Sequence, residues 1–171
     1  MLLILLACTA PSDTADSNPA ALPEPWVDHY QATSVIQAGG FSFDEEYLVR
    51  RMVDPPAGRI VEEFIATADG TLTETTLEID ADAATFTLSF SDDSYSGTGT
   101  LEGPAWAWTG WESHSVAQDG STVDSVDTVD EAGAIHAEKV GYNAQGEQEW
   151  TLVEDLAPIS EDTWTELHGA L

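Results

Sequence analysis

The segment FSFDEEYLVRRMV (41–53) places two adjacent arginines inside an alternating pattern of apolar and polar residues. Neighbouring residues of a strand face opposite sides, so either face turned inward brings Arg50 or Arg51 with it. A buried guanidinium needs a partner, and its planar fork suits a carboxylate or phosphate. We predict that Arg51 or Arg50, together with Tyr47 on the same strand, contacts a bound ligand. The alternative is a structural ion pair with one of three glutamates: Glu45, Glu62 or Glu63.

Tryptophans are the second group of residues that could form a binding site. In PAWAWTGWESH (104–114), Trp106 and Trp108 share a face, whereas Trp111 has the opposite parity unless Gly110 marks a bulge. Indoles can line a ligand cavity, because such sites are mostly apolar and aromatic. We predict Trp106, Trp108 and Trp150 as ligand contacts. The alternative is that these rings only fill the core.

Patterns typical of catalysis or metal binding are missing from the sequence. The four histidines are far apart in the chain, and the acidic stretch 119–131 lacks the spacing of a calcium-binding loop. No nucleophile elbow, phosphate-binding loop or dinucleotide fingerprint occurs. We therefore expect no catalytic residues, no metal and no cofactor, and a protein that is not an enzyme.

The elements that must position these side chains are strands. From Phe41 onward the hydrophobic period is two; in TFTLSF (85–90), for example, the apolar residues alternate with threonine and serine. Turn-forming segments interrupt the pattern every 8–12 residues or so, a spacing typical of sandwiches and barrels. We predict an all-β fold, an antiparallel up-and-down meander of about 8–10 strands that forms a barrel or a strongly curved sheet. A short N-terminal helix is expected within 26–38, with a strand as the alternative.

Charge limits the possible partners of the protein. The chain has four Lys and Arg against 32 Asp and Glu, a net charge of −28. Nucleic acid binding needs a basic face and is excluded, as is electrostatic attachment to anionic lipid. The outward rows of the predicted strands would carry Asp, Glu, Thr and Ser, whereas a barrel inserted in a membrane needs apolar outward rows. The predicted barrel therefore faces water.

The N-terminus carries an apolar run that ends in the single cysteine of the chain, Leu5-Leu6-Ala7-Cys8. This stretch resembles the lipobox of bacterial lipoprotein signals. The resemblance implies a signal peptide at 1–7, a lipid on Cys8, and export to the cell envelope. Thr9 follows the cysteine, which implies the outer membrane. Residues 8–25 are rich in proline and small polar residues and read as a flexible tether to one domain at 26–171.

The predicted meander with its short helix and aromatic interior is similar in architecture to the calycins, the group of lipocalin-like and fatty-acid-binding-like barrels. The resemblance covers about residues 26–168 and implies a small apolar or amphipathic ligand inside the barrel. We therefore expect a lipid-anchored, non-enzymatic binding protein whose membrane contact is the N-terminal lipid alone. The alternative is a structural or adhesive surface module with a solid core and no ligand.

Overall fold

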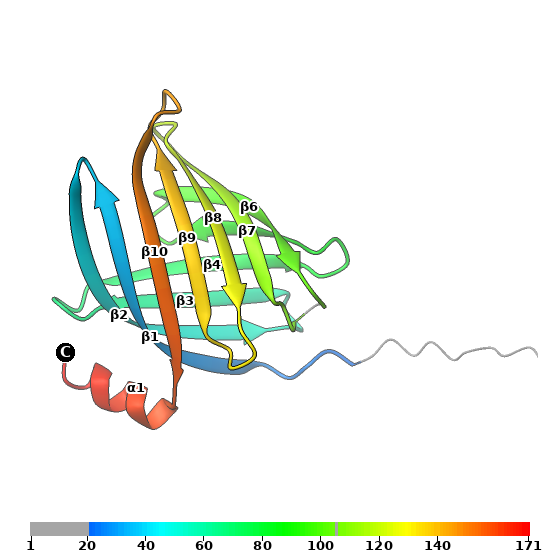
Figure 1. Ribbon diagram of the computed structural model, residues 1–171. Coiled ribbons are helices and arrows are strands. Elements are labelled where there is room, and N and C mark those ends of the chain that lie inside the picture. The colour runs from blue at the N-terminus through cyan, green and yellow to red at the C-terminus, as the bar shows by residue number, and fades with distance from the viewer. Residues whose placement is uncertain (1–20, 105) are drawn as a thin grey trace, which may run out of the picture.

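The computed structural model describes residues 21–104 and 106–171, and in this part of the chain ten antiparallel strands form one closed barrel (Figure 1). The strands are β1 (Trp26–Ala38), β2 (Phe41–Asp54), β3 (Arg59–Ala66), β4 (Leu72–Asp80), β5 (Thr85–Phe90), β6 (Tyr95–Glu102), β7 (Gly110–Ala117), β8 (Thr122–Val129), β9 (Ile135–Tyr142) and β10 (Gln148–Ile159). One helix, α1 (Glu161–His168), follows β10.

Each strand pairs with the next along the chain, and β10 returns to pair with β1. This closing ladder runs from His29 opposite Ile159 to Ala38 opposite Trp150. The prediction of an all-β antiparallel meander that closes into a barrel is confirmed. Asp-Gly and related turn signals in the sequence mark most of the connections correctly, because these residues tolerate the tight backbone of hairpin turns.

The short N-terminal helix predicted within 26–38 is wrong, since this segment is β1. Its residues alternate strictly between buried and exposed from Tyr30 to Val35. The inward row contains Ala32 and Ser34, whose small or polar side chains hide the apolar period of a strand. Gly39 and Gly40 form the turn to β2 with positive φ angles of 57° and 84°.

The helix lies instead at the C-terminal end, outside the barrel and next to β1 and β2 (Figure 1). Ser160 caps it by accepting a hydrogen bond from the backbone N–H of Thr163, and two acidic residues occupy its first turn. Trp164 is buried against the outward-facing Leu48 of β2 and Ile65 of β3. The helix therefore covers an apolar strip that the barrel wall would otherwise expose.

An apolar cluster fills one end of the barrel, which we call the closed end. Val53, Ile60, Leu77 and Phe86 are buried there, and the rings of Trp106 and Trp108 pack against them. The opposite end carries the turns 39–40, 67–71, 91–94, 118–121 and 143–147, and we call it the open end. Core packing is thus concentrated at one end of the barrel.

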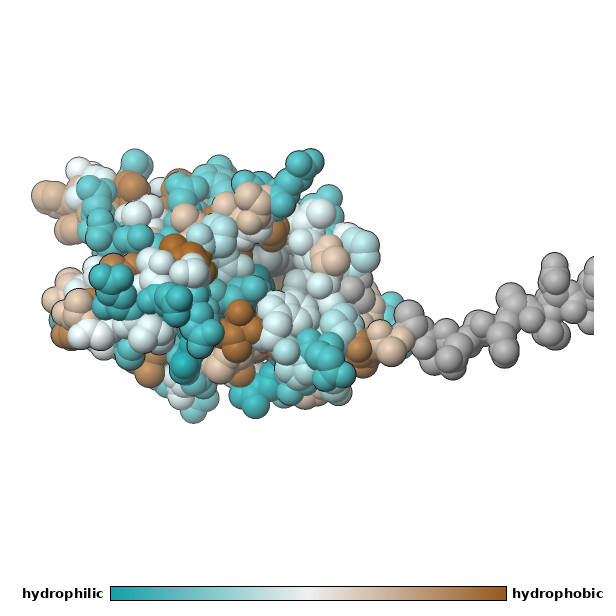
Figure 2. Space-filling model, turned by 90° about the horizontal axis from the view of Figure 1, so that it is seen from below, coloured by the Kyte–Doolittle hydropathy of each residue, from teal (hydrophilic) through white to brown (hydrophobic). Residues whose placement is uncertain are grey.

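The face of the molecule seen in Figure 2 carries mostly hydrophilic residues, with hydrophobic residues scattered among them. On β7 and β8 the outward residues Glu112, His114 and Asp124 are polar and exposed, as predicted for outward rows. Within the part of the chain that the structure describes, no helix is long and apolar enough to span a membrane.

Substitution of Gly99 tests the packing inside β6. A Cβ atom at this position would collide with the ring of Phe86 and with the backbone oxygen of Glu112. Because overpacking costs about 1–3 kcal/mol, we expect Gly99→Ala to lower the free energy of unfolding by that amount in urea denaturation. Ser96→Ala, at an exposed position of the same strand, is the control and should change stability by less than about 0.5 kcal/mol. Equal stability of the two variants would contradict this packing.

Candidate functional site

A cavity of about 450 Å³ occupies the barrel interior. It extends from Phe86 and Trp111 near the closed end to Ala66 and Thr71 at the open end. Its volume lies within the range of about 300–1,000 Å³ that is usual for small-molecule sites. The barrel is therefore not filled by its own side chains.

The cavity has two chemically different walls. On β3, β4 and β5 it is lined mainly by apolar side chains: Phe64, Leu77, Phe86, Leu88 and Phe90. On β7 to β10 polar groups predominate, and they include Ser113, Ser125, Asp127, Lys139 and Glu154. An amphipathic molecule would match this arrangement, with its apolar part against the first wall and its polar part against the second.

Two ion pairs lie in the interior, Arg51 with Glu62 and Lys139 with Glu154. Arg51 is 7 % exposed; its Nε lies 3.1 Å from Oε1 of Glu62, and its guanidinium carbon lies 4.8 Å from the ring centre of Trp111. Lys139 Nζ donates to Oε2 of Glu154 at 2.8 Å. Burial disfavours the ammonium of Lys139, but the carboxylates of Glu154 and Asp127 outweigh it and raise the pKa of the lysine.

Asp127 is a buried carboxyl group without an ion pair of this kind. Its side chain is 6 % exposed and accepts one hydrogen bond, from Ser125 Oγ at 2.6 Å. Burial raises the pKa of Asp127 from 3.8 to about 6, against the opposing effects of Lys139 and Ser125. A carboxyl group in this state changes its charge near neutral pH.

Tyr47 is the predicted site residue that most clearly lines the cavity. Its hydroxyl donates to Oγ of Ser34 on β1, and burial raises the pKa of the tyrosine. At neutral pH the phenol is thus a neutral group. It contributes polarity to the cavity without charge.

The two arginines face opposite sides of β2, as the alternation requires. Arg51 points inward, but Glu62 already neutralises it, which is the structural alternative that the sequence left open. Arg50 lies on the outer face, 2.6 Å from Glu63 and under the ring of Trp164 of α1. The structure therefore brings Arg51 and Tyr47 to the barrel interior and leaves Arg50 outside it.

The predicted tryptophans fall into two places: Trp106 and Trp108 lie together, and Trp150 lies apart from them. Trp106 and Trp108 lie in the connection between β6 and β7 and pack in the closed-end cluster, with their ring centres 5.4 Å apart. Trp150 packs over Gly141, where its ring occupies the space of a Cβ atom. The indole that lines the cavity is Trp111, on the inward row of β7, and no bulge at Gly110 is needed to place it there.

Sequence reasoning missed Lys139, Asp127 and Glu154 as inward-facing residues. The register shows why they meet: Ala137 is opposite Asp127 on one side and Glu154 on the other, and Lys139 lies two residues further along the same row. Starting from one residue that is known to face the interior and counting every second residue along each strand would have identified them. In an acidic chain, however, the carboxylates alone gave no signal.

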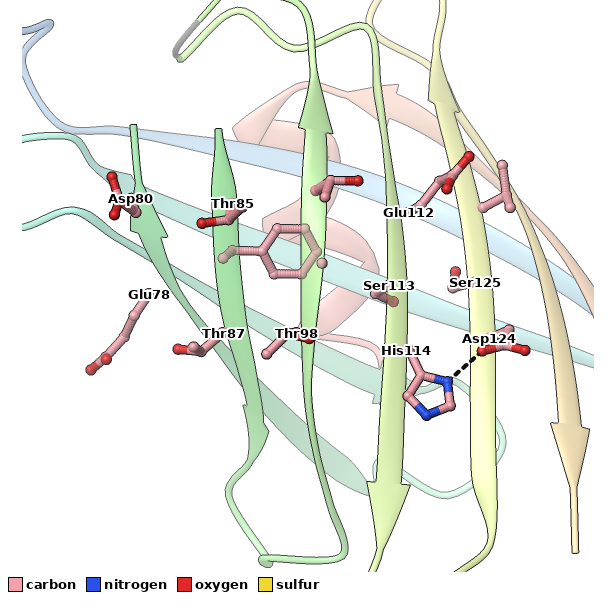
Figure 3. A pocket seen from close by; sticks show the side chains of 14 residues that line it. Glu78, Asp80, Thr85, Thr87, Thr98, Glu112, Ser113, His114, Asp124 and Ser125 are labelled. Carbon is pink, nitrogen blue, oxygen red and sulfur yellow. Dashed lines mark hydrogen bonds and ion pairs between the residues drawn. The ribbon is translucent and has the colours of Figure 1, made fainter. Parts of the chain in front are cut away.

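A second hollow lies on the outer face of β4 to β8 and has a volume of about 730 Å³. Figure 3 shows hydroxyl groups of Thr85, Thr87 and Thr98 across it, with the side chains of His114 and Asp124 joined by a hydrogen bond of 2.6 Å. Most of these side chains are exposed to solvent. The hollow lacks the buried polar groups of the interior cavity, which we therefore take as the candidate site.

Cys8, the predicted signal peptide 1–7 and most of the predicted tether 8–25 lie outside the described residues. Among residues 21–104 and 106–171, no three histidine, aspartate or glutamate side chains form a group that could hold a metal ion.

Comparisons with known proteins add a likeness of fold. A search of protein-family models found no match, and none of the curated proteins matched. Among solved structures, the chain is similar to the crystal structure of a DUF1329 family protein from Desulfovibrio piger, with a TM-score of 0.33 and 8 % identity over 77 % of this chain and 83 % of that one. At this level of similarity, function has to be argued from the barrel itself.

The buried state of Asp127 predicts a specific dependence of stability on pH. Between about pH 4 and pH 6 the folded state keeps this proton while the unfolded chain loses it, so the free energy of unfolding falls as pH rises through that window. The loss is at most about 3 kcal/mol, because one pKa unit corresponds to about 1.4 kcal/mol. The variant Asp127→Asn has no carboxyl group at this position and therefore does not lose stability in this way.

Urea denaturation at pH 4 and pH 7 measures this effect. The stability of Asp127→Asn relative to the unmodified protein should rise by up to about 3 kcal/mol between the two pH values. Glu112→Gln, which changes an exposed carboxylate of the neighbouring strand β7, is the control and should show no such rise. A constant difference for Asp127→Asn would mean that its pKa is not raised.

Proposed function

We propose that this protein binds a small amphipathic molecule inside its barrel and is not an enzyme. The observation that carries the proposal is the cavity of about 450 Å³, in which the apolar wall of β3 to β5 faces the polar wall of β7 to β10. A solid-cored structural module would have no reason to leave this space empty, since close packing of the interior is the more stable arrangement. The cavity therefore favours binding over the structural alternative.

The open end offers a route for such a ligand. Phe41 and Phe43 lie on the inward-facing row of β2 beyond Glu45, and they are 70 % and 53 % exposed. Exposed aromatic side chains at the mouth of a cavity provide a first contact for an apolar chain that leaves water. The closed end, by contrast, is blocked by the cluster around Trp106 and Trp108.

We further propose that the protein is attached to the cell envelope, at the outer membrane, by a lipid on Cys8. The support is the lipobox-like Leu5-Leu6-Ala7-Cys8, together with the start of the described chain at the closed end, which leaves the open end free for ligand. Expression in a bacterial host with a radiolabelled fatty acid tests this. Label should be found on the full chain and be lost in Cys8→Ser; equal labelling of both proteins would disprove the anchor.

Binding can be tested with the neutral fluorescent probe N-phenyl-1-naphthylamine, whose emission increases in apolar surroundings. We expect saturable binding at one site per chain. Ser113→Trp adds a large ring on the cavity wall and should weaken binding at least about 10-fold, because it fills the space that the probe needs. Glu112→Trp, at the neighbouring outward position, is the matched control and should bind normally.

Absence of saturable binding to the unmodified protein would count against the proposal and for the solid structural module. The reverse pattern, with loss of binding in Glu112→Trp alone, would place the probe in the outer hollow, which Glu112 lines.

A further inference from the structure

We propose that the barrel cavity selects organic cations: amphipathic molecules whose ammonium head pairs with Asp127 and whose apolar chain lies against the wall of β3 to β5. This inference rests on the proposed binding function and adds the class of ligand. It also departs from the expectation that an interior arginine binds an anionic head group.

Carboxylates outnumber cations in the interior. Glu45, Glu62, Asp127 and Glu154 line the cavity together with one cation, Lys139. Arg51, buried beside Glu62, is the second cation of this region. Glu45 is exposed at the open end, and the other three carboxylates exceed the two cations by one negative charge when all are ionised, so a ligand that brings a positive charge compensates it.

Both interior cations are already engaged. Arg51 is held between the carboxylate of Glu62 and the ring of Trp111, and Thr75 donates a further hydrogen bond to Glu62 at 3.2 Å. Lys139 is hydrogen-bonded to Glu154. An anionic head group would add a negative charge beside the carboxylates of Glu62 and Glu154, which is unfavourable in a buried site.

Asp127 is the group that a cation would complete. Its single hydrogen bond comes from Ser125, a neutral hydroxyl, and its side chain is almost fully buried on the polar wall. The ammonium of Lys139 lowers the pKa of Asp127 but is hydrogen-bonded to Glu154, and burial still destabilises the ionised form of Asp127. An ammonium placed beside it would pair with it directly and would also be close to the hydroxyl of Ser125.

The neighbouring elements fix where the rest of the ligand lies. Trp111 of β7 is directly opposite Asp127 in the register, and Ala137 is opposite it on β9. From there the cavity continues past Leu77 and Phe86 along the apolar wall toward the open end. A chain that starts at Asp127 therefore passes from polar to apolar surroundings without a turn.

The charge of the whole protein acts in the same direction. A net charge of −28 attracts cations and repels anions at a distance, to an extent that falls as salt screens it. The local pairing at Asp127 and the long-range field thus favour the same class of molecule.

Protonation of Asp127 should oppose binding. The charged groups that act on it are Lys139 of β9, Glu154 of β10 and Glu62 of β3; β7 places the neutral Trp111 opposite it. Below about pH 6 the carboxyl group is neutral, so the advantage of a cation over a neutral molecule of the same chain length should shrink.

Three amphiphiles with the same chain and different heads test the proposal: dodecylamine, dodecanol and dodecanoate. Each is added below its micelle concentration, and its affinity is measured by displacement of N-phenyl-1-naphthylamine at pH 7.5. We expect dodecylamine to bind at least about 10-fold more tightly than dodecanol, and dodecanoate to bind most weakly, because only the amine pairs with Asp127.

Asp127→Asn should reduce the preference for dodecylamine over dodecanol, measured as the ratio of their affinities in the same variant, to less than about 3-fold, because the amide carries no charge. Asp124→Asn removes an exposed aspartate from the same strand and should keep the full preference, which separates local pairing from net charge. The unmodified protein provides a test without substitution: its preference should shrink at pH 5.

The possible failures are distinguishable. If the probe binds but dodecanol or dodecanoate matches dodecylamine, the selectivity is wrong and the cavity proposal stands. If neither the probe nor any amphiphile binds, the binding function itself fails. A preference that persists unchanged at pH 5 and in Asp127→Asn would show that another group recognises the cation, and would overturn the assignment of Asp127.

Discussion

The ladder between β1 and β10 is the interaction on which the rest of the structure depends. Before it forms, the sheet has two free edges and no inside, and every inward-facing residue is open to water. Once the ten paired residues from His29 to Ala38 are joined to β10, one row of every strand becomes interior. The cavity follows from that closure, because its lining combines residues of β2 to β5 with residues of β7 to β10.

Closure explains why charged groups can remain inside. Arg51 and Glu62 are opposite each other on neighbouring strands, whereas Lys139 reaches diagonally to Glu154, which is two residues away in the register of β9 and β10. Such pairs rarely add much stability over apolar residues of the same size. Polar residues halfway along the barrel therefore limit how far the apolar cluster extends from the closed end, and the space beyond them stays open.

The alternating pattern was sufficient to predict the strands but not which face of each strand is interior. TFTLSF has one apolar and one polar row, so its orientation could be read directly. IHAEKVGY of β9 has two mixed rows, and Lys139 shares the inward one with Ala137 and Gly141. Side-chain types alone cannot orient such a strand. The pairing register identifies the inward row of β9, because it connects β9 through the intervening strands to β5, whose apolar row is clear.

The same reasoning explains the errors at the two ends of the chain. In β1 the inward row includes Ala32 and Ser34, so its alternation depends on neighbours that the sequence does not reveal. At the C-terminal end the sequence contains local signals for a helix: Ser160 as the cap, two acidic residues, then Trp164 and Leu167 on one face. Local chemistry therefore specified the helix, whereas the identity of β1 depends on the strands on either side of it.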